Sequence, residues 1–406
     1  MTRPARPAGP FEDHGAAAPD ASRVAVAHAL RPRGAAARLW LARAIAWSLL
    51  LGGWLALGAL GHGAALAGGW PGLALAAWLA SMGVLIAAGT GIAIPMRTLD
   101  VGLVVAAAFA ALSLAATNGA SPLPLVAAGF GWATLLVLAS RTVKVLRETA
   151  PRPTSAPIGP AIAGACIAWA LAGEPDTVAD RTTAIGACLI ACSLCLVALR
   201  PRRASPATAC RAGLFDCALP LPHHGWTTPR DWPMHAASLS MLPMMAALAP
   251  MAQICASEGL PAAHVGALHL AAMLLPAWAL QGPLGRCPRS VLAGFVATLL
   301  AAGGLLAILG TRHDALLAGM LVHAFAWSLA WAGPMLARDA PARPPPGRAG
   351  ALGLAVASAA LVAALAAAVS ATGEPALRVA HAVLAAFAVG ALWPASPARR
   401  RTTPIV

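Results

Sequence analysis

The sequence predicts an all-α membrane protein with twelve transmembrane helices arranged as two halves of six. Its composition is the first reason: 59% of the 406 residues are hydrophobic and only 10% are charged, whereas soluble domains carry about 25% charged residues. The second reason is that apolar runs of about 20 residues, long enough to cross a bilayer as a helix, recur along the chain. The third is the placement of the basic residues, which separates the two sides of the membrane.

The apolar runs form two groups of six, in residues 39–199 and 234–394, joined by a basic connection over residues 200–233. The first group has predicted spans at 39–61, 71–94, 99–117, 121–140, 157–173 and 183–199. The second has spans at 234–255, 260–281, 290–310, 315–337, 349–372 and 376–394. Residues 1–38 lack apolar periodicity and are predicted to be a disordered cytoplasmic segment, and residues 395–406 form a short tail. The first apolar run is long enough to stay in the membrane, so it is not a signal peptide.

The basic residues fix the predicted orientation, because short cytoplasmic loops are enriched in Lys and Arg. With the N-terminus inside, 25 of the 28 basic residues fall in inward segments or, for Arg43, at the inward end of a span, and the exceptions are Arg181, Arg312 and Arg378. Both termini and residues 200–233 are therefore predicted to be cytoplasmic. The protein is predicted to lie in the inner membrane of a bacterium. The net charge of +14 reflects this topology. We expect the lipid bilayer and an unknown small solute as partners, no nucleic acid, and a monomer.

A hairpin between the eighth and ninth spans carries a recognisable motif, Gly282-Pro283-Leu284-Gly285-Arg286-Cys287-Pro288-Arg289. It resembles the loop between helices 8 and 9 of major facilitator superfamily transporters, whose pattern is glycine, any residue, leucine, small, aspartate, arginine, any, glycine, arginine, basic. The aspartate is missing here, and Pro288 stands for the second glycine and Ser290 for the last basic residue. A second stretch, Ile158-Gly159-Pro160-Ala161-Ile162-Ala163-Gly164, resembles the glycine-rich motif of the fifth helix in antiporters of that superfamily.

The resemblance implies two parallel six-helix halves, each built from inverted three-helix repeats. It implies a secondary transporter or facilitator, with no enzyme activity and no cofactor. In the family, the arginines of the hairpin motif help to hold the two halves together in one gating state. Carried over to this chain, the gating loop would consist of Gly282, Gly285, Arg286 and Arg289.

Residues that could act at membrane depth are few. All 14 acidic residues are assigned outside the spans or to a span end, Asp100 being the second residue of 99–117. A buried charge costs about 2.5–3.5 kcal/mol on insertion scales, so any proton coupling is expected to use histidine. His323 and His269 are the candidates. Trp327 and Trp331 follow His323 at helical spacing in span ten, which lines the cavity in the resembled fold, and Trp40, Trp47 and Trp54 form a stripe on span one. Large aromatic residues suit a small, largely apolar solute, but they also serve packing and interface anchoring.

The predicted substrate cavity also includes two methionines of span seven, in the set Trp47, Trp54, Met241, Met245, His323, Trp327 and Trp331. An alternative function, as a copper- or haem-binding membrane protein, would use His235, Met241, Met245 and His269, because thioether and imidazole groups bind soft metals. Methionine is also an adaptable core residue. Cys188, Cys192 and Cys195 share a helix face, where they would serve either a soft metal or simple packing. A non-transporting sensor or scaffold on this fold is a third possibility.

Overall fold

A computed structural model describes residues 21–66, 72–89, 94–117, 121–149, 158–172, 178–200, 259, 262–336 and 348–392. These residues form α-helices and short connections, with no strand among them. The first six helices are α1 (Ala21–Leu66), α2 (Leu73–Gly89), α3 (Met96–Ala115), α4 (Leu123–Thr149), α5 (Ile158–Ala172) and α6 (Val178–Ala198). The later ones are α9 (Ala262–Ala279), α10 (Gln281–Leu284), α11 (Arg289–Leu309), α12 (His313–Leu336), α13 (Arg348–Thr372) and α14 (Glu374–Leu392).

Eleven of the twelve predicted spans coincide with these helices, α10 being a single extra turn inside the hairpin. The remaining span, residues 234–255, lies outside the described residues. The all-helical architecture is therefore confirmed, whereas the count of twelve and the orientation stay predictions. The largest difference is at α1, which begins at Ala21 rather than near residue 39. Alanine, leucine and arginine have high helix propensity, so a helix can extend beyond the apolar stretch that hydropathy detects.

Several helices have the character of membrane spans. Among the described residues, five stretches are long and apolar enough to cross a membrane: Gly34–Gly58, Met96–Ala115, Leu123–Arg147, Asp180–Ala198 and Val291–Leu309. The stretch in α1 is 83% buried inside the bundle, whereas those in α3, α6 and α11 are only 33% buried. Large apolar side chains such as Val105, Leu194 and Leu309 are exposed on those outer helices. An apolar surface of this extent is expected to face lipid.

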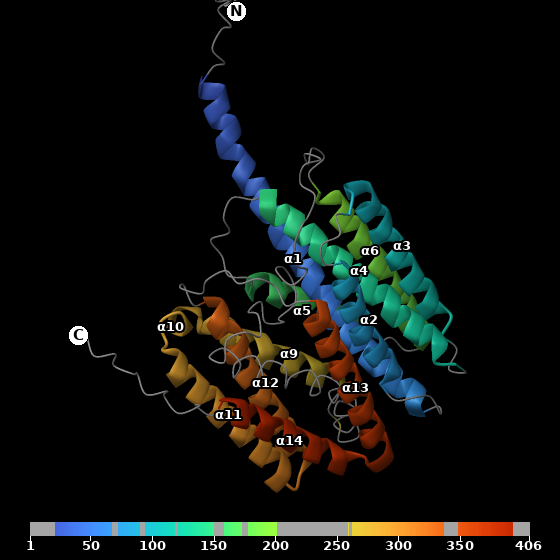
Figure 1. The fold of residues 1–406 in the computed structure, drawn as a ribbon, viewed down its shortest axis with the longest axis vertical. Coiled ribbons are helices and arrows are strands. Elements are labelled where there is room, and N and C mark those ends of the chain that lie inside the picture. Colours follow the sequence, from blue (N-terminus) through green and yellow to red (C-terminus); the bar gives the residue numbers. More distant parts are fainter. Residues whose placement is uncertain are drawn as a thin grey trace, which may run out of the picture.

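The helix contacts repeat between the two halves, which Figure 1 shows as a blue-to-green group and a yellow-to-red group. Helix α3 packs on α4 and α6, and α2 packs on α4. Six predicted spans later, α11 packs in the same way on α12 and α14, and α9 packs on α12. The second half therefore repeats the packing of the first, as expected for two structural repeats.

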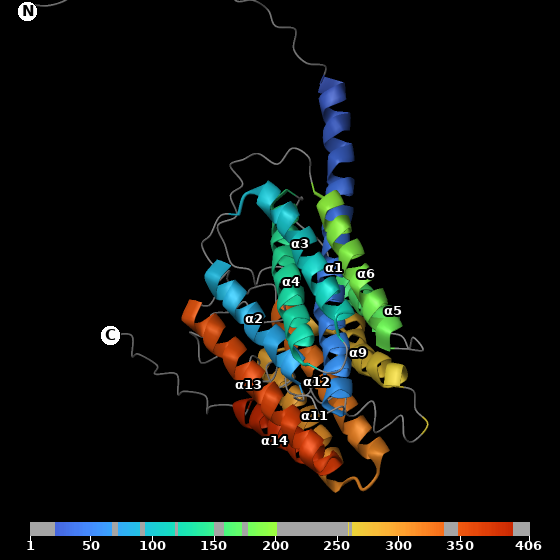
Figure 2. The ribbon, with the colours of Figure 1, turned by 90° about the vertical axis from the view of Figure 1, so that its right-hand side faces the viewer.

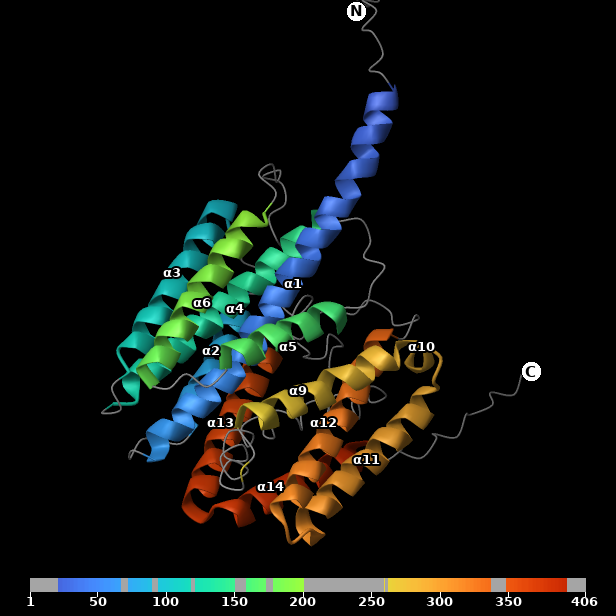
Figure 3. The same cartoon turned by 180° about the vertical axis from the view of Figure 1, so that it is seen from behind.

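The two halves meet along two seams that are themselves equivalent. Helix α2 packs along α13, and α5 packs against α9, so the second and fifth helices of one half meet the fifth and second of the other. Figures 2 and 3 show α2 beside α13 and α5 beside α9 from two sides. Gly72, just before α2, has a φ of +68°, and a Cβ there would lie 2.5 Å from the Ala366 Cβ of α13. The α2–α13 seam therefore depends on a residue without a side chain.

Within each half, glycines let helix backbones approach closely, which is how membrane helices commonly associate. A Cβ on Gly164 of α5 would lie 2.5 Å from the Trp47 Cβ and 2.7 Å from the Ala44 carbonyl oxygen of α1. In the second half, a Cβ on Gly303 of α11 would lie 2.9 Å from the Gly319 carbonyl oxygen of α12. Gly164 belongs to the glycine-rich motif seen in the sequence, and the structure gives it a packing role.

Candidate functional site between the two halves

Helices α1 and α9 bring the two halves into contact through a tryptophan and a histidine. Trp54 of α1 is 2% exposed and His269 of α9 is fully buried. Their rings lie edge to face, with centroids 5.8 Å apart and an interplanar angle of 65°. A Cβ on Gly266, one turn before His269, would lie 3.9 Å from a Leu55 methyl group of α1. Two residues chosen from the sequence for different reasons, Trp54 and His269, therefore meet across the halves.

His269 has a buried ring without hydrogen bonds. Neither of its ring nitrogens has a hydrogen-bond partner among the described residues. A buried polar group without a partner costs about 1–3 kcal/mol, and most such groups in folded proteins find a partner in protein or water. Within the described ranges, no hydrogen bond offsets the energetic cost of burying this imidazole at the contact between the halves.

The other two buried histidines lie together inside the second half. His323 of α12 is fully buried and His381 of α14 is 4% exposed, and their ring centroids are 5.1 Å apart. Gly303 lies next to them, since a Cβ there would be 3.7 Å from the His381 Nε2. The His323 ring contacts His381 of α14, and the cavity-facing stripe that His323 was expected to share with Trp327 and Trp331 stays a prediction. The sequence analysis assigned no role to His381, because an isolated histidine in an apolar span gives no signal of its partner.

The predicted tryptophans differ in exposure. Trp47 and Trp327 are each 3% exposed, whereas Trp40 is 43% exposed at the start of the stripe on α1. Trp331 belongs to α12, but its side chain lies outside the described set. Two further tryptophans were not singled out from the sequence, Trp78 of α2 and Trp132 of α4, and both are buried.

Trp132 and Trp78 press against α1 close to the contact between the halves. The Trp132 Nε1 donates a hydrogen bond to the Leu49 carbonyl oxygen over 2.9 Å. A Cβ on Gly53 would lie 3.0 Å from that nitrogen and 3.2 Å from the Trp78 ring. The aromatic residues therefore surround one turn of α1, immediately before Trp54.

A proline inside α9 is accompanied by a hydrogen bond to a serine of α12. Pro276 lies inside α9 and cannot donate the hydrogen bond that a helix needs there, and its ring disturbs the preceding turn. The Ser328 Oγ accepts a hydrogen bond from the Ala277 N–H over 3.0 Å. In a membrane, backbone groups freed by proline must be satisfied by such side chains. Helix α9, which carries His269, is thereby fixed to α12, which carries His323.

The gating loop expected from the resemblance forms a tight turn at one end of the second half. Residues 281–284 form α10, which packs on α12 and α9. The Arg286 and Cys287 N–H groups both donate to the Pro283 carbonyl oxygen. Gly282, Gly285 and Arg286 are exposed. Arg289 begins α11, and its side chain lies outside the described set.

Several basic residues of the first half lie within helices. From the sequence, these residues were expected at the inward ends of the spans. Arg43 of α1 and Arg141 and Lys144 of α4 are 9%, 6% and 8% exposed. The Arg141 guanidinium donates to the carbonyl oxygen of Gly89, the last residue of α2. Arg43 lies in the middle of α1, and Arg141 and Lys144 lie in the last third of α4, so these cations belong to packed helices rather than to loops.

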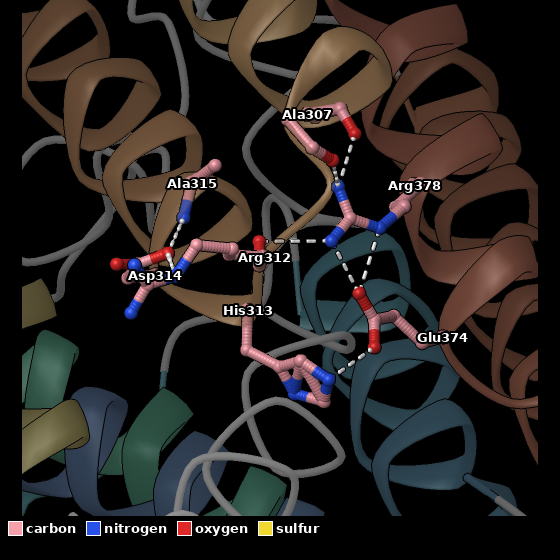
Figure 4. A network of polar contacts seen from close by, with 8 residues as sticks. Ala307, Arg312, His313, Asp314, Ala315, Glu374 and Arg378 are labelled. Atoms are coloured by element: carbon pink, nitrogen blue, oxygen red, sulfur yellow. Dashed lines mark hydrogen bonds and ion pairs between the residues drawn. The ribbon is translucent and has the colours of Figure 1, made fainter.

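At the end of the second half away from the hairpin, polar contacts join the start of α14 to the end of α11 (Figure 4). Arg378 of α14 donates to the carbonyl oxygens of Ala307, Gly310 and Arg312, where α11 ends. Its Nε also donates to the Glu374 carboxylate over 2.7 Å, and that carboxylate lies 3.0 Å from the His313 Nε2. Arginine here satisfies the carbonyl groups that a helix C-terminus leaves without partners.

The cysteines of α6 do not form one site. Cys188 and Cys192 line a small cavity of about 10 Å³ together with Ser48 and Trp132, which is room for roughly one water molecule. Cys195 is exposed. Within the described ranges, no three His, Cys, Asp or Glu side chains gather closely enough to hold a metal ion. The alternative copper- or haem-binding function would also involve His235, Met241 and Met245. These residues lie outside the described ranges.

Solved structures with the same arrangement are transporters. The nucleoside transporter NupG aligns with a TM-score of 0.52 and 13% identity, over 88% of this chain and 97% of the transporter. A D-xylose-proton symporter aligns with a TM-score of 0.50 and 14% identity, over 86% of this chain and 96% of the symporter. This chain has the major facilitator fold. No family model and no curated protein sequence matches it.

Proposed function

We propose that the chain is a secondary transporter or facilitator for a small, largely apolar solute in a bacterial inner membrane. Its working unit would be the monomer, with both termini in the cytoplasm. The observation that carries this proposal is the repeated helix packing, with two halves joined along the equivalent α2–α13 and α5–α9 seams. Two internally packed bundles with such seams can rock against each other and expose a central site to each side in turn.

The solute would bind between the halves, at the wall formed by Trp54 and His269. Trp47, His323 and Trp327, which also belong to the expected set, are buried in the packed helices. Met241, Met245 and Trp331 complete the set expected from the sequence. Aromatic residues offer large apolar surfaces, which supports a solute with considerable apolar area.

Proton coupling, if the protein uses it, would depend on histidine. The described carboxylates lie near helix ends: Asp180, Asp314 and Glu374 occupy the first turns of α6, α12 and α14. Asp100 lies one turn into α3, where it pairs with Arg200 over 2.7 Å. Histidines are the side chains whose ordinary titration range lies near physiological pH, and His269 and His323 lie in the middle of their helices.

A cross-link between the halves tests the transport mechanism. With the native cysteines replaced, Leu55→Cys and Gly266→Cys would join α1 to α9 through a short thiol cross-linker. Purified protein in liposomes would be assayed for uptake from a panel of labelled neutral solutes. We expect cross-linking to abolish uptake, because the halves could no longer part.

The control is a cross-link within the first half. A Cβ on Gly186 of α6 would lie 3.1 Å from the Ala111 Cβ of α3, so Gly186→Cys with Ala111→Cys joins two helices that move together. Uptake should survive that cross-link. Equal inhibition by both cross-links, or no uptake of any solute before cross-linking, would contradict the proposal.

The topology has its own test. A cysteine placed at Thr177 should react with a membrane-impermeant thiol reagent in intact cells. The native Cys210, in the predicted cytoplasmic connection, should react only after the membrane is opened. Labelling of Cys210 from outside would overturn the orientation.

A further inference from the structure

His269, one of three buried histidines in the described part of the chain, contacts the other half through its ring. Its neighbour across the contact is Trp54, 5.8 Å away between ring centroids. His323 and His381 instead face each other within the second half. Parting of the halves would therefore separate His269 from Trp54, whereas the contact between His323 and His381 lies within one half.

The polar atoms of His269 are unused. Both ring nitrogens lack a hydrogen-bond partner in the described part of the chain, although the side chain is fully buried. A neutral imidazole offers one N–H donor and one nitrogen acceptor. A ligand with an acceptor for this N–H, or with a donor for the other nitrogen, would satisfy a group that the described residues leave without a hydrogen bond.

Charge near the contact restricts the ligand further. On α1, the Lys or Arg residue nearest to Trp54 is Arg43, about 16 Å away along the helix axis. Arg141 and Lys144 lie toward the same end of the first half, since α4 runs antiparallel to α1 with Trp132 bonded beside Leu49. Arg378, Glu374, His313, Arg312 and Asp314 gather at the far end of α11, α12 and α14. Trp54 and His269 thus meet at a level of the bundle away from these charged groups.

We propose that His269 and Trp54 form the recognition site for an uncharged solute that combines a flat apolar ring with at least one hydrogen-bonding group. The inference rests on the proposed transport function and specifies its substrate class. The ring of the solute would pack on Trp54 when the halves part, and its hydrogen-bonding group would pair with His269. A wholly apolar solute would leave the imidazole unsatisfied and bind more weakly.

Indole and 1-methylindole make a matched pair of probes, because they share a flat ring but only indole carries an N–H donor. Thermal unfolding of the purified protein would be followed with each probe, since binding to the folded state raises the melting temperature. We expect indole to bind about tenfold or more tightly than 1-methylindole, as loss of one hydrogen bond to a buried group predicts. In His269→Leu the two probes should bind alike.

Two further variants separate recognition from packing. His264 is exposed on the same helix, so His264→Gln should keep the difference between the probes. Trp54→Leu should weaken both probes by a similar factor and keep their ratio. If neither probe raises the melting temperature of the wild type, or if the ratio persists in His269→Leu, the inference is wrong.

Chemical modification tests separately whether His269 recognises the solute and whether the two halves part as the proposed transport requires. Diethyl pyrocarbonate would be applied to the protein in liposomes and each histidine followed by mass spectrometry. We expect slow modification of His269 that is slowed further by indole, whereas indole should not change the modification of His323 or His381. Modification of His269 with equal affinity for both probes would reject the recognition site but keep the rocking halves. An unreactive His269 would reject both.

Discussion

The two halves repeat the same helix packing with different polar residues. In the first half, the buried polar side chains include Arg43, Arg141 and Lys144, and tryptophans surround α1. In the second half, they include His269, His323 and His381. Even the arginine clamps are placed differently. Arg200 ties the end of α6 to the start of α3, whereas Arg378 ties the start of α14 to the end of α11.

This difference separates what maintains the fold from what serves function. Close packing through small residues occurs in both halves, at Gly164 in one and at Gly303 with Gly319 in the other. The polar groups differ because they need not be repeated to keep the packing. The first half supplies fixed positive charge and aromatic surface, and the second supplies groups that can exchange protons. At the contact between Trp54 and His269, an aromatic side chain of the first half meets a titratable side chain of the second.

The largest expected effect comes from filling the close contacts. Gly164→Val and Gly303→Val should each destabilise the protein by about 1–3 kcal/mol or more, because overpacking forces helices apart. Thermal unfolding in detergent would measure it. If the two halves are equivalent in packing, the two losses should be similar.

Matched glycines in each half provide the controls. Gly159→Ala places a Cβ at an ordinary 3.5 Å from the Trp40 Nε1, and Gly353→Ala meets nothing within 4 Å. Both should be neutral or slightly stabilising, since alanine is favoured over glycine in helices by about 1 kcal/mol. A severe loss in only one half would show that the packing equivalence is superficial.

Next in size is the clamp at the end of the second half. Arg378→Gln should cost about 2–3 kcal/mol, because hydrogen bonds to charged groups contribute more than neutral ones and three carbonyl groups lose a donor. Arg312→Gln is the control, since Arg312 is 83% exposed and lies 3.5 Å from Asp314; exposed pairs contribute about 0–1 kcal/mol. Equal decreases of the denaturant midpoint in Arg378→Gln and Arg312→Gln would show that the Arg378 contacts do not stabilise the end of α11.

A smaller effect is expected from two serines that use their hydroxyl groups in opposite ways. Ser328→Ala removes the acceptor of the Ala277 N–H and should cost about 1–2 kcal/mol. Ser193 of the first half donates to the Ile190 carbonyl oxygen of its own helix, so Ser193→Ala should be nearly neutral. In a Pro276→Ala background, helix α9 regains its own hydrogen bonds and the cost of Ser328→Ala should disappear. Additive effects would contradict this coupling.

The histidine pair is expected to matter for pH dependence more than for stability. If proton exchange drives transport, His323→Gln should abolish the pH dependence of uptake between about pH 5.5 and 7.5, the range in which a hydrated imidazole gains its proton as pH falls. His381→Gln should reduce or shift that dependence, because His381 is the ring neighbour of His323. An unchanged pH profile in well-folded His323→Gln would leave His323 as a packing residue.

The sequence predicted the helices far better than their partners. Span positions follow from long apolar runs, and eleven of them match helices. The pairing of His323 with His381 joins spans ten and twelve, and nothing in the local pattern of either span specifies a neighbour. Arg141 and Lys144 were assigned to an inward edge because charge usually marks the end of a span, but α4 continues to Thr149. Pro276 in an apolar span was a visible signal of a kink, although it did not identify Ser328.

The smallest effect on stability is expected at Arg286, the exposed arginine of the hairpin after α9. Surface substitutions usually change stability by less than about 0.5 kcal/mol, so Arg286→Ala should fold and unfold like the wild type. If the loop controls the parting of the halves, the same variant should change the rate of uptake or the reactivity of His269 toward diethyl pyrocarbonate. Arg286→Lys keeps the charge but loses the planar guanidinium. Full function in Arg286→Lys with altered function in Arg286→Ala would assign the role to charge alone, whereas wild-type behaviour of both variants would reject gating by this residue.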